Sequence, residues 1–162
     1  MVAELAPTPS PMLEQLKRFF GGQTSAKEML REHGAIELAT AALLIELAHA
    51  DFSVEGSELV AVRQLLEQHF GISGAALQAL MVEAARRLDR SVSLHEFTYQ
   101  LDHELPHDDK LAVIEMLWRV SNADGHIDTE EELLIARIAG LLHVSDRDRM
   151  RLKLKVVVSP GP

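Results

Sequence analysis

The chain has 162 residues, 47% hydrophobic and 25% charged, a composition typical of one soluble globular domain. Twenty-five acidic against sixteen basic residues give a net charge of −9, which disfavours nucleic acid and anionic membrane surfaces as partners. The absence of cysteine excludes disulfides, thiol catalysis and thiolate metal sites. Any metal ligand must therefore be an oxygen or an imidazole.

The N-terminal residues 1–11 carry Glu4 and three prolines, where a signal peptide would have basic and apolar regions. The most apolar stretch, 35–50, is interrupted by polar residues and is too short to span a bilayer. We therefore expect a cytoplasmic chain without membrane insertion.

The predicted organisation is a disordered leader over 1–10, a single helical domain over 11–157 and a tail over 158–162. A short amphipathic helix is expected before Gly21 and Gly22. From Gly34 onwards Ala, Leu and Glu dominate and the breaks fall at Gly, Ser, Asp and Pro, so that every periodic segment favours helix. Helices are predicted over 35–51, 55–70, 74–89, 93–104, 107–123, 128–142 and 146–157.

Several helix starts carry capping signals, among them Ser93 with Glu96 three residues later, Pro106 before two aspartates, and Ser145. The segments 35–50 and 111–123 leave no wide polar face, which predicts that both helices lie at the centre of a bundle. The C-terminal helix is the weakest assignment, because its sequence also alternates with a period of two.

An internal repeat organises these helices. A shift of 73 residues aligns 44–59 with 117–132 and places Asp51 on Asp124 and Glu58 on Glu131. We therefore predict an all-α fold of two three-helix repeats, 35–89 and 107–157, joined by a connector helix over 93–104. A pseudo-twofold axis is expected to relate the repeats around the two central apolar helices.

Acidic residues gather where the second helix of each repeat begins. Each copy places an Asp at the end of a buried helix, where the helix dipole is unfavourable to a carboxylate and a nearby cation would stabilise it. Oxygen ligands suit Ca²⁺, Mg²⁺ or Mn²⁺ better than Zn²⁺. The predicted metal ligands are Asp124, Asp128 and Glu131 in the second hairpin and Asp51, Glu55 and Glu58 in the first.

Helix capping is the alternative explanation for the same acids. Asp128 and Glu131 have the spacing of a capping box, and first-turn acids gain about 0.3–1 kcal/mol from the helix dipole. Gly125 fits a helix end in the same way. No lysine or arginine lies between residues 32 and 62 or between 120 and 136, so bases outside these ranges, Arg63 and Arg119 among them, would have to neutralise the acids.

The second hairpin also overlays most of an EF-hand loop. Its first ligand position is Val120, however, which we expect to be buried in the incoming helix, so a true EF-hand is not predicted.

The duplicated pattern reads ADGHIDTEE in the second copy and ADFSVEGSE in the first. Within two three-helix units, and with LEQLKRFF near the start, it resembles the tellurite-resistance TerB family over residues 13–157. The resemblance implies an all-helical, internally pseudo-symmetric fold with acidic residues proposed to bind divalent metal. It also implies an association with tellurite or general stress resistance and no enzyme activity. Phe52 and Glu55 depart from the family pattern in the first copy.

We therefore expect a TerB-like protein that binds a divalent cation and acts as a non-enzymatic adaptor or scaffold with a protein partner. The alternative is a structural interaction module without metal, whose acids only cap helices. Self-association stays open, since the basic run over 147–155 is either a solvated helix face or a surface that docks on an acidic hairpin of another subunit. The sequence holds no P-loop or GxSxG motif, and Pro106 breaks the helical register that would align His103 and His107 as metal ligands.

Overall fold

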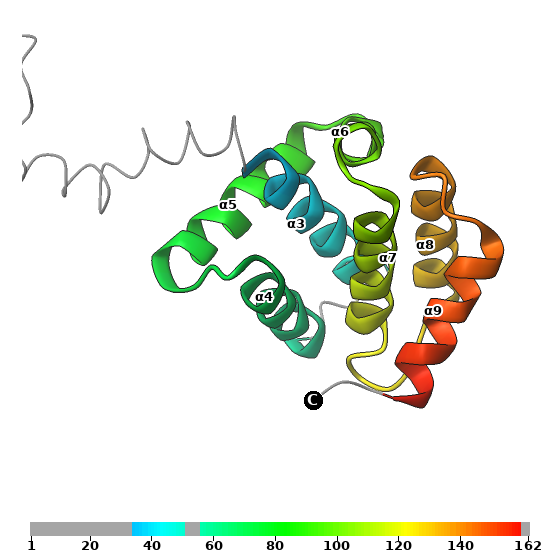
Figure 1. Cartoon of the computed structure of the whole chain (residues 1–162). Coiled ribbons are helices and arrows are strands. Elements are labelled where there is room, and N and C mark those ends of the chain that lie inside the picture. Colours follow the sequence, from blue (N-terminus) through cyan, green and yellow to red (C-terminus); the bar gives the residue numbers. More distant parts are fainter. Residues whose placement is uncertain (1–33, 51–55, 160–162) are drawn as a thin grey trace, which may run out of the picture. The chain divides into compact units, whose positions relative to one another are not determined.

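The computed structural model describes residues 34–50 and 56–159, which form seven helices and no strand. The predicted all-α class is thereby confirmed. The chain divides into two units, residues 1–35 and 36–162. The predicted leader and the short helix before Gly21 lie outside the described residues. The helices shown in Figure 1 are α3 (Gly34–Ala48), α4 (Gly56–Phe70), α5 (Gly74–Arg90), α6 (His95–Glu104), α7 (His107–Ser121), α8 (Thr129–Leu141) and α9 (Asp146–Val158).

Most helix boundaries fall within two residues of the predicted ones, and the C-terminal segment is the helix α9. Ser145 caps α9 as predicted, because its Oγ accepts a hydrogen bond from the backbone N of Asp148 at 3.1 Å. The predicted cap at Ser93 is wrong. Its Oγ accepts instead from the backbone N of His95, the first residue of α6, at 3.2 Å, and the cap position is Leu94.

The two helices predicted to be central contain much of the aliphatic core. In α3, Leu43, Leu44 and Leu47 are fully buried. In α7, Ile114, Leu117 and Trp118 are equally buried, as is Val120, which confirms the expectation for that residue. The core is mostly aliphatic and gains its stability from apolar surface removed from water.

Helix α7 organises the second half of the domain because it contacts α4, α8 and α9 (Figure 1). Trp118 fixes one of these contacts: its indole Nε1 donates to the backbone oxygen of Arg149 in α9 at 3.0 Å. The Lys153 ammonium lies 5.5 Å from the centroid of the same ring. This packing sets the position of the turn between α7 and α8, which carries the second acidic hairpin.

Among the helices of the described residues, none combines the length and the apolar composition that a membrane span requires.

Candidate functional site

The second acidic hairpin is the seven-residue turn between the end of α7 and the start of α8. Gly125 adopts a left-handed conformation with φ of +84°, which reverses the chain. Asp124 Oδ1 accepts a hydrogen bond from the backbone N of His126 at 2.9 Å. The turn is therefore held by an aspartate side chain bound to its own backbone two residues on.

Asp124 does not lie in the last helical turn as predicted. Helix α7 ends at Ser121, and the cap position is Asn122, so Asp124 belongs to the turn itself. The sequence suggested that Asp124 faces the unfavourable negative end of the helix dipole. In the structure its carboxylate instead accepts a hydrogen bond from the backbone N of His126. The shorter helix follows from Gly125, whose backbone N bonds the oxygen of Asn122 at 2.9 Å and closes the turn early.

Asp128 and Glu131 form the capping box that the sequence pattern allowed. Asp128 is the N-cap of α8, and its side chain bonds the backbone of Glu131 while Glu131 bonds back to Asp128. The second of these bonds runs from the backbone N of Asp128 to Glu131 Oε1 at 3.2 Å. His126 Nε2 also lies 3.2 Å from Asp128 Oδ1 at the exposed side of the turn.

Glu131 connects the two helices as well as capping one of them. Its side chain is buried, with only 1% of the residue surface exposed, and Ser121 Oγ in α7 donates to Oε1 at 2.9 Å. The other oxygen, Oε2, is buried and has no hydrogen-bond partner in the part of the chain that the structure describes. A buried carboxylate oxygen in this state is costly unless a cation, a proton or water satisfies it.

The six predicted metal ligands are thus only partly placed. Asp124, Asp128 and Glu131 lie on one hairpin, and Glu58 lies buried in the first turn of α4 with 2% of its surface exposed. Asp51 and Glu55 fall outside the described residues. Over residues 34–50 and 56–159, no group of three or more histidine, aspartate or glutamate side chains is arranged to hold a metal ion. The metal site therefore stays a prediction.

The distant bases named from the sequence do not reach the second hairpin. Arg119 Nη2 pairs with Glu115 Oε2 at 2.7 Å, one turn back along α7. Arg63 Nη1 instead donates to Gln78 Oε1 at 3.2 Å, between α4 and α5. Neither guanidinium therefore neutralises Asp124 through these contacts.

Sequence reasoning missed Ser121, the donor that α7 contributes to Glu131. A serine within the mostly apolar segment 111–123, ten residues before a capping glutamate, is the signal that was available. The signal is weak, because the contact depends on how α7 packs against α8.

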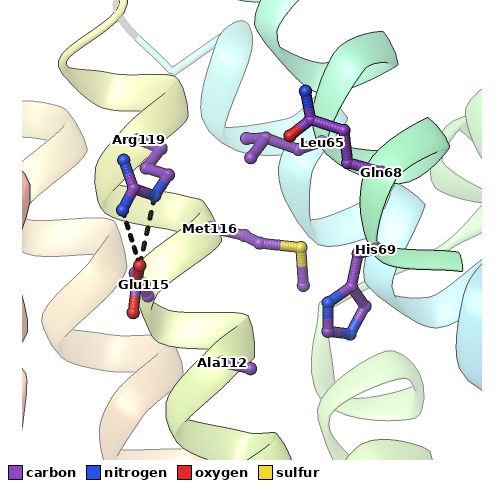
Figure 2. A pocket seen from close by; sticks show the side chains of 7 residues that line it. All are labelled: Leu65, Gln68, His69, Ala112, Glu115, Met116 and Arg119. Carbon is purple, nitrogen blue, oxygen red and sulfur yellow. Dashed lines mark hydrogen bonds and ion pairs between the residues drawn. The ribbon is translucent and has the colours of Figure 1, made fainter. Parts of the chain in front are cut away.

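A pocket of about 290 Å³ between α4 and α7 was also not predicted. Figure 2 shows Met116 reaching from α7 toward His69 of α4, with the Glu115 and Arg119 ion pair at one side. The remaining lining residues are Leu65, Gln68 and Ala112.

The charged side of this pocket is held by a three-residue cluster. Lys155 Nζ of α9 lies 2.9 Å from Glu115 Oε1, while Arg119 holds Oε2. Burial acts to raise the pKa of Glu115, but the hydrogen bonds from Lys155 and Arg119 outweigh it and leave the pKa below its ordinary value. Glu115 is therefore ionised at neutral pH and poorly suited to donate a proton.

A second polar cluster joins three elements at the other end of α7. Asp102 in α6 accepts from Lys110 Nζ at 2.6 Å and lies 3.0 Å from His143 Nδ1, beyond the end of α8. The hydrogen bond from Lys110, followed by that from His143, lowers the pKa of Asp102. His143 has a φ of 60°, an uncommon conformation for a residue with a side chain.

Comparison with protein families gives a match to the family described as tellurite resistance protein TerB, over residues 37–154. Searches against curated proteins and against solved structures gave no match. The matched region covers all of the second acidic hairpin and well over half of the sequence. The chain therefore belongs to the TerB family.

Proposed function

We propose that this TerB family chain binds a divalent cation at its second acidic hairpin and serves as a non-enzymatic adaptor in the response to tellurite or to general stress. The family supplies the link to tellurite resistance, and TerB is not an established enzyme family. The observation that carries the cation proposal is the buried oxygen Oε2 of Glu131.

The energetic argument concerns the two oxygens of Glu131 separately. Oε1 accepts from Ser121 and from the backbone of Asp128, so its burial is compensated. Oε2 has no such compensation from the described residues. A cation beside Oε2, drawing further oxygens from Asp128 and Asp124 in the same hairpin, would stabilise it. The hard oxygen donors favour Ca²⁺, Mg²⁺ or Mn²⁺.

The first hairpin supports the same proposal less directly. Glu58 is aligned with Glu131 in the repeat and is buried to nearly the same degree. We extend the proposed site to Glu58 with Asp51 and Glu55 on this correspondence.

A module whose acids only cap helices is the second candidate function, and a specific observation favours it. The capping box of Asp128 and Glu131 already employs one carboxylate oxygen of Glu131 and the side chain of Asp128. In that case the chain acts through its surface alone.

Calorimetric titration separates the two candidates. The full chain is titrated with Ca²⁺, Mg²⁺ and Mn²⁺ and compared with the double variant Asp124→Asn/Glu131→Gln. Saturable binding that the double variant loses supports the cation site. A free cation concentration of about 100 times the dissociation constant should also raise the free energy of unfolding by about 2.7 kcal/mol.

The control is Glu130→Gln, which makes the same substitution as Glu131→Gln in the same helical turn but at an exposed side chain. This variant should bind as the wild type does. Absence of saturable binding in the wild type, or equal binding by the double variant, would leave capping as the role of these acids. Growth on tellurite of a host that expresses each variant then tests the stress role independently.

A further inference from the structure

Helix α9 has two different faces. Leu152 and Val156 are buried against the body of the domain. On another face, Met150, Leu154 and Val158 repeat every four residues and are exposed, with Leu154 at 62% and Val158 at 76%. This spacing places them in one row along the helix. We call this row the α9 stripe.

A row of basic side chains runs beside the stripe. Arg147, Arg151 and Lys155 also repeat every four residues, each three residues before a residue of the stripe and so beside it on the helix surface, and all three are exposed. Arg151 pairs with Asp148 at 3.1 Å, and Lys155 pairs with Glu115 at 2.9 Å, yet each remains 56% exposed. Arg147 has no ion pair among the described residues. Arg147 is therefore open to a partner, and Arg151 and Lys155 expose the remainder of their charged side chains beside it.

We propose that the α9 stripe and its basic row bind an amphipathic acidic helix of another protein. An apolar row on such a helix would cover Met150, Leu154 and Val158, as anchors at helical spacing do when one helix docks on another. An adjacent row of Asp or Glu would face Arg147, Arg151 and Lys155 and fix the orientation.

Two other occupants fit the surface less well. A second copy that pairs its α9 antiparallel to the first would bring the two basic rows together, and like charges facing each other oppose pairing. An anionic membrane is larger than α9, so it would also face the rest of the chain, whose net charge of −9 repels it. A single acidic helix meets only α9, because charges beyond a Debye length of about 8 Å are screened at physiological salt.

The inference deepens the adaptor role proposed above by giving the chemistry of a partner, and it rests on that role. It does not depend on the hairpin cation. Binding is therefore measured in the presence of a chelator, so that failure of the cation proposal and failure of this one are distinguishable.

The probe is a fluorescein-labelled synthetic helical peptide with leucine at every third or fourth position and glutamate beside each leucine. Fluorescence anisotropy with the full chain should show saturable binding that weakens as salt is added. Leu154→Glu should weaken it at least about tenfold, as loss of a central anchor does. Arg147→Glu should weaken it several-fold and reduce the salt dependence.

Val92→Glu is the matched control, because Val92 is a fully exposed apolar residue between α5 and α6, away from α9. It should bind the peptide as the wild type does, and a peptide with lysine in place of glutamate should not bind. Equal binding by Leu154→Glu and Val92→Glu, or no binding at all, would overturn the proposal. So would either alternative occupant: dimerisation in analytical ultracentrifugation that Leu154→Glu abolishes, or tight binding to phosphatidylserine vesicles without binding to the acidic peptide.

Discussion

Replacing Trp118 with phenylalanine tests whether one side chain fixes α9 on α7. The substitution removes the hydrogen bond to the backbone oxygen of Arg149, worth about 0.5–1.5 kcal/mol. It also removes roughly 40 Å² of buried apolar surface, which adds about 1 kcal/mol at ~25 cal/mol per Å². The interaction of Lys153 with the ring is weakened rather than lost. Trp118→Phe should therefore reduce the free energy of unfolding by about 2 kcal/mol.

Thermal unfolding followed by circular dichroism measures this change as a fall in Tm of about 4–8 °C for a chain of this size. Urea unfolding should give the same loss of stability with an unchanged slope. The matched control is Val82→Ala in α5, at a half-exposed side chain, which should change stability by less than about 0.5 kcal/mol. A loss for Trp118→Phe no larger than that of the control would refute the role assigned to the indole.

Three further predictions concern single positions. Asp102→Asn should destabilise the domain at neutral pH, because the fold lowers the pKa of Asp102 and so favours its ionised form. Urea unfolding at a series of pH values should show the stability difference between wild type and variant shrinking as the pH falls below the ordinary value of 3.8. A stability difference that grows at low pH would contradict this prediction. Gly125→Ala should lower the free energy of unfolding by about 1 kcal/mol, because Gly125 has a positive φ. Gly140→Ala within α8 should raise it by about 0.5–1 kcal/mol, because an added Cβ meets nothing within 4 Å. Tm shifts of the same sign for the two variants would contradict this pair of predictions. Ser145→Ala should cost about 1 kcal/mol through the lost cap and speed amide hydrogen exchange in the first turn of α9, and unchanged exchange there would show that the cap is dispensable.

The positions of the helices follow largely from local sequence, because several of the described breaks contain a residue with a specific backbone role. Ser145 caps α9 through its own hydroxyl, and Gly125 supplies the left-handed turn after α7. Ser93 shows the limit of this reasoning. Its hydroxyl bonds the backbone of His95 and does not cap α6, whose cap position is Leu94. A serine three residues before a glutamate has the same sequence pattern whether or not the serine caps the helix.

The candidate site depends more on packing than on pattern. The capping box of Asp128 and Glu131 can be read from their spacing alone. The burial of Glu131 and its bond to Ser121 cannot, because they require α7 and α8 to lie side by side. The exposure of the α9 stripe is equally invisible in the sequence, since Leu154 and Leu152 are the same residue type on opposite faces of one helix.

The burial of Trp118 gives the protein an intrinsic optical reporter. The chain has a single tryptophan, so all of its indole emission comes from the contact between α7 and α9. Separation of α9 from the domain would hydrate the ring and shift this emission to longer wavelength. A ligand that covers only the α9 stripe would leave the emission wavelength unchanged. Unlabelled protein can therefore distinguish docking on α9 from detachment of α9.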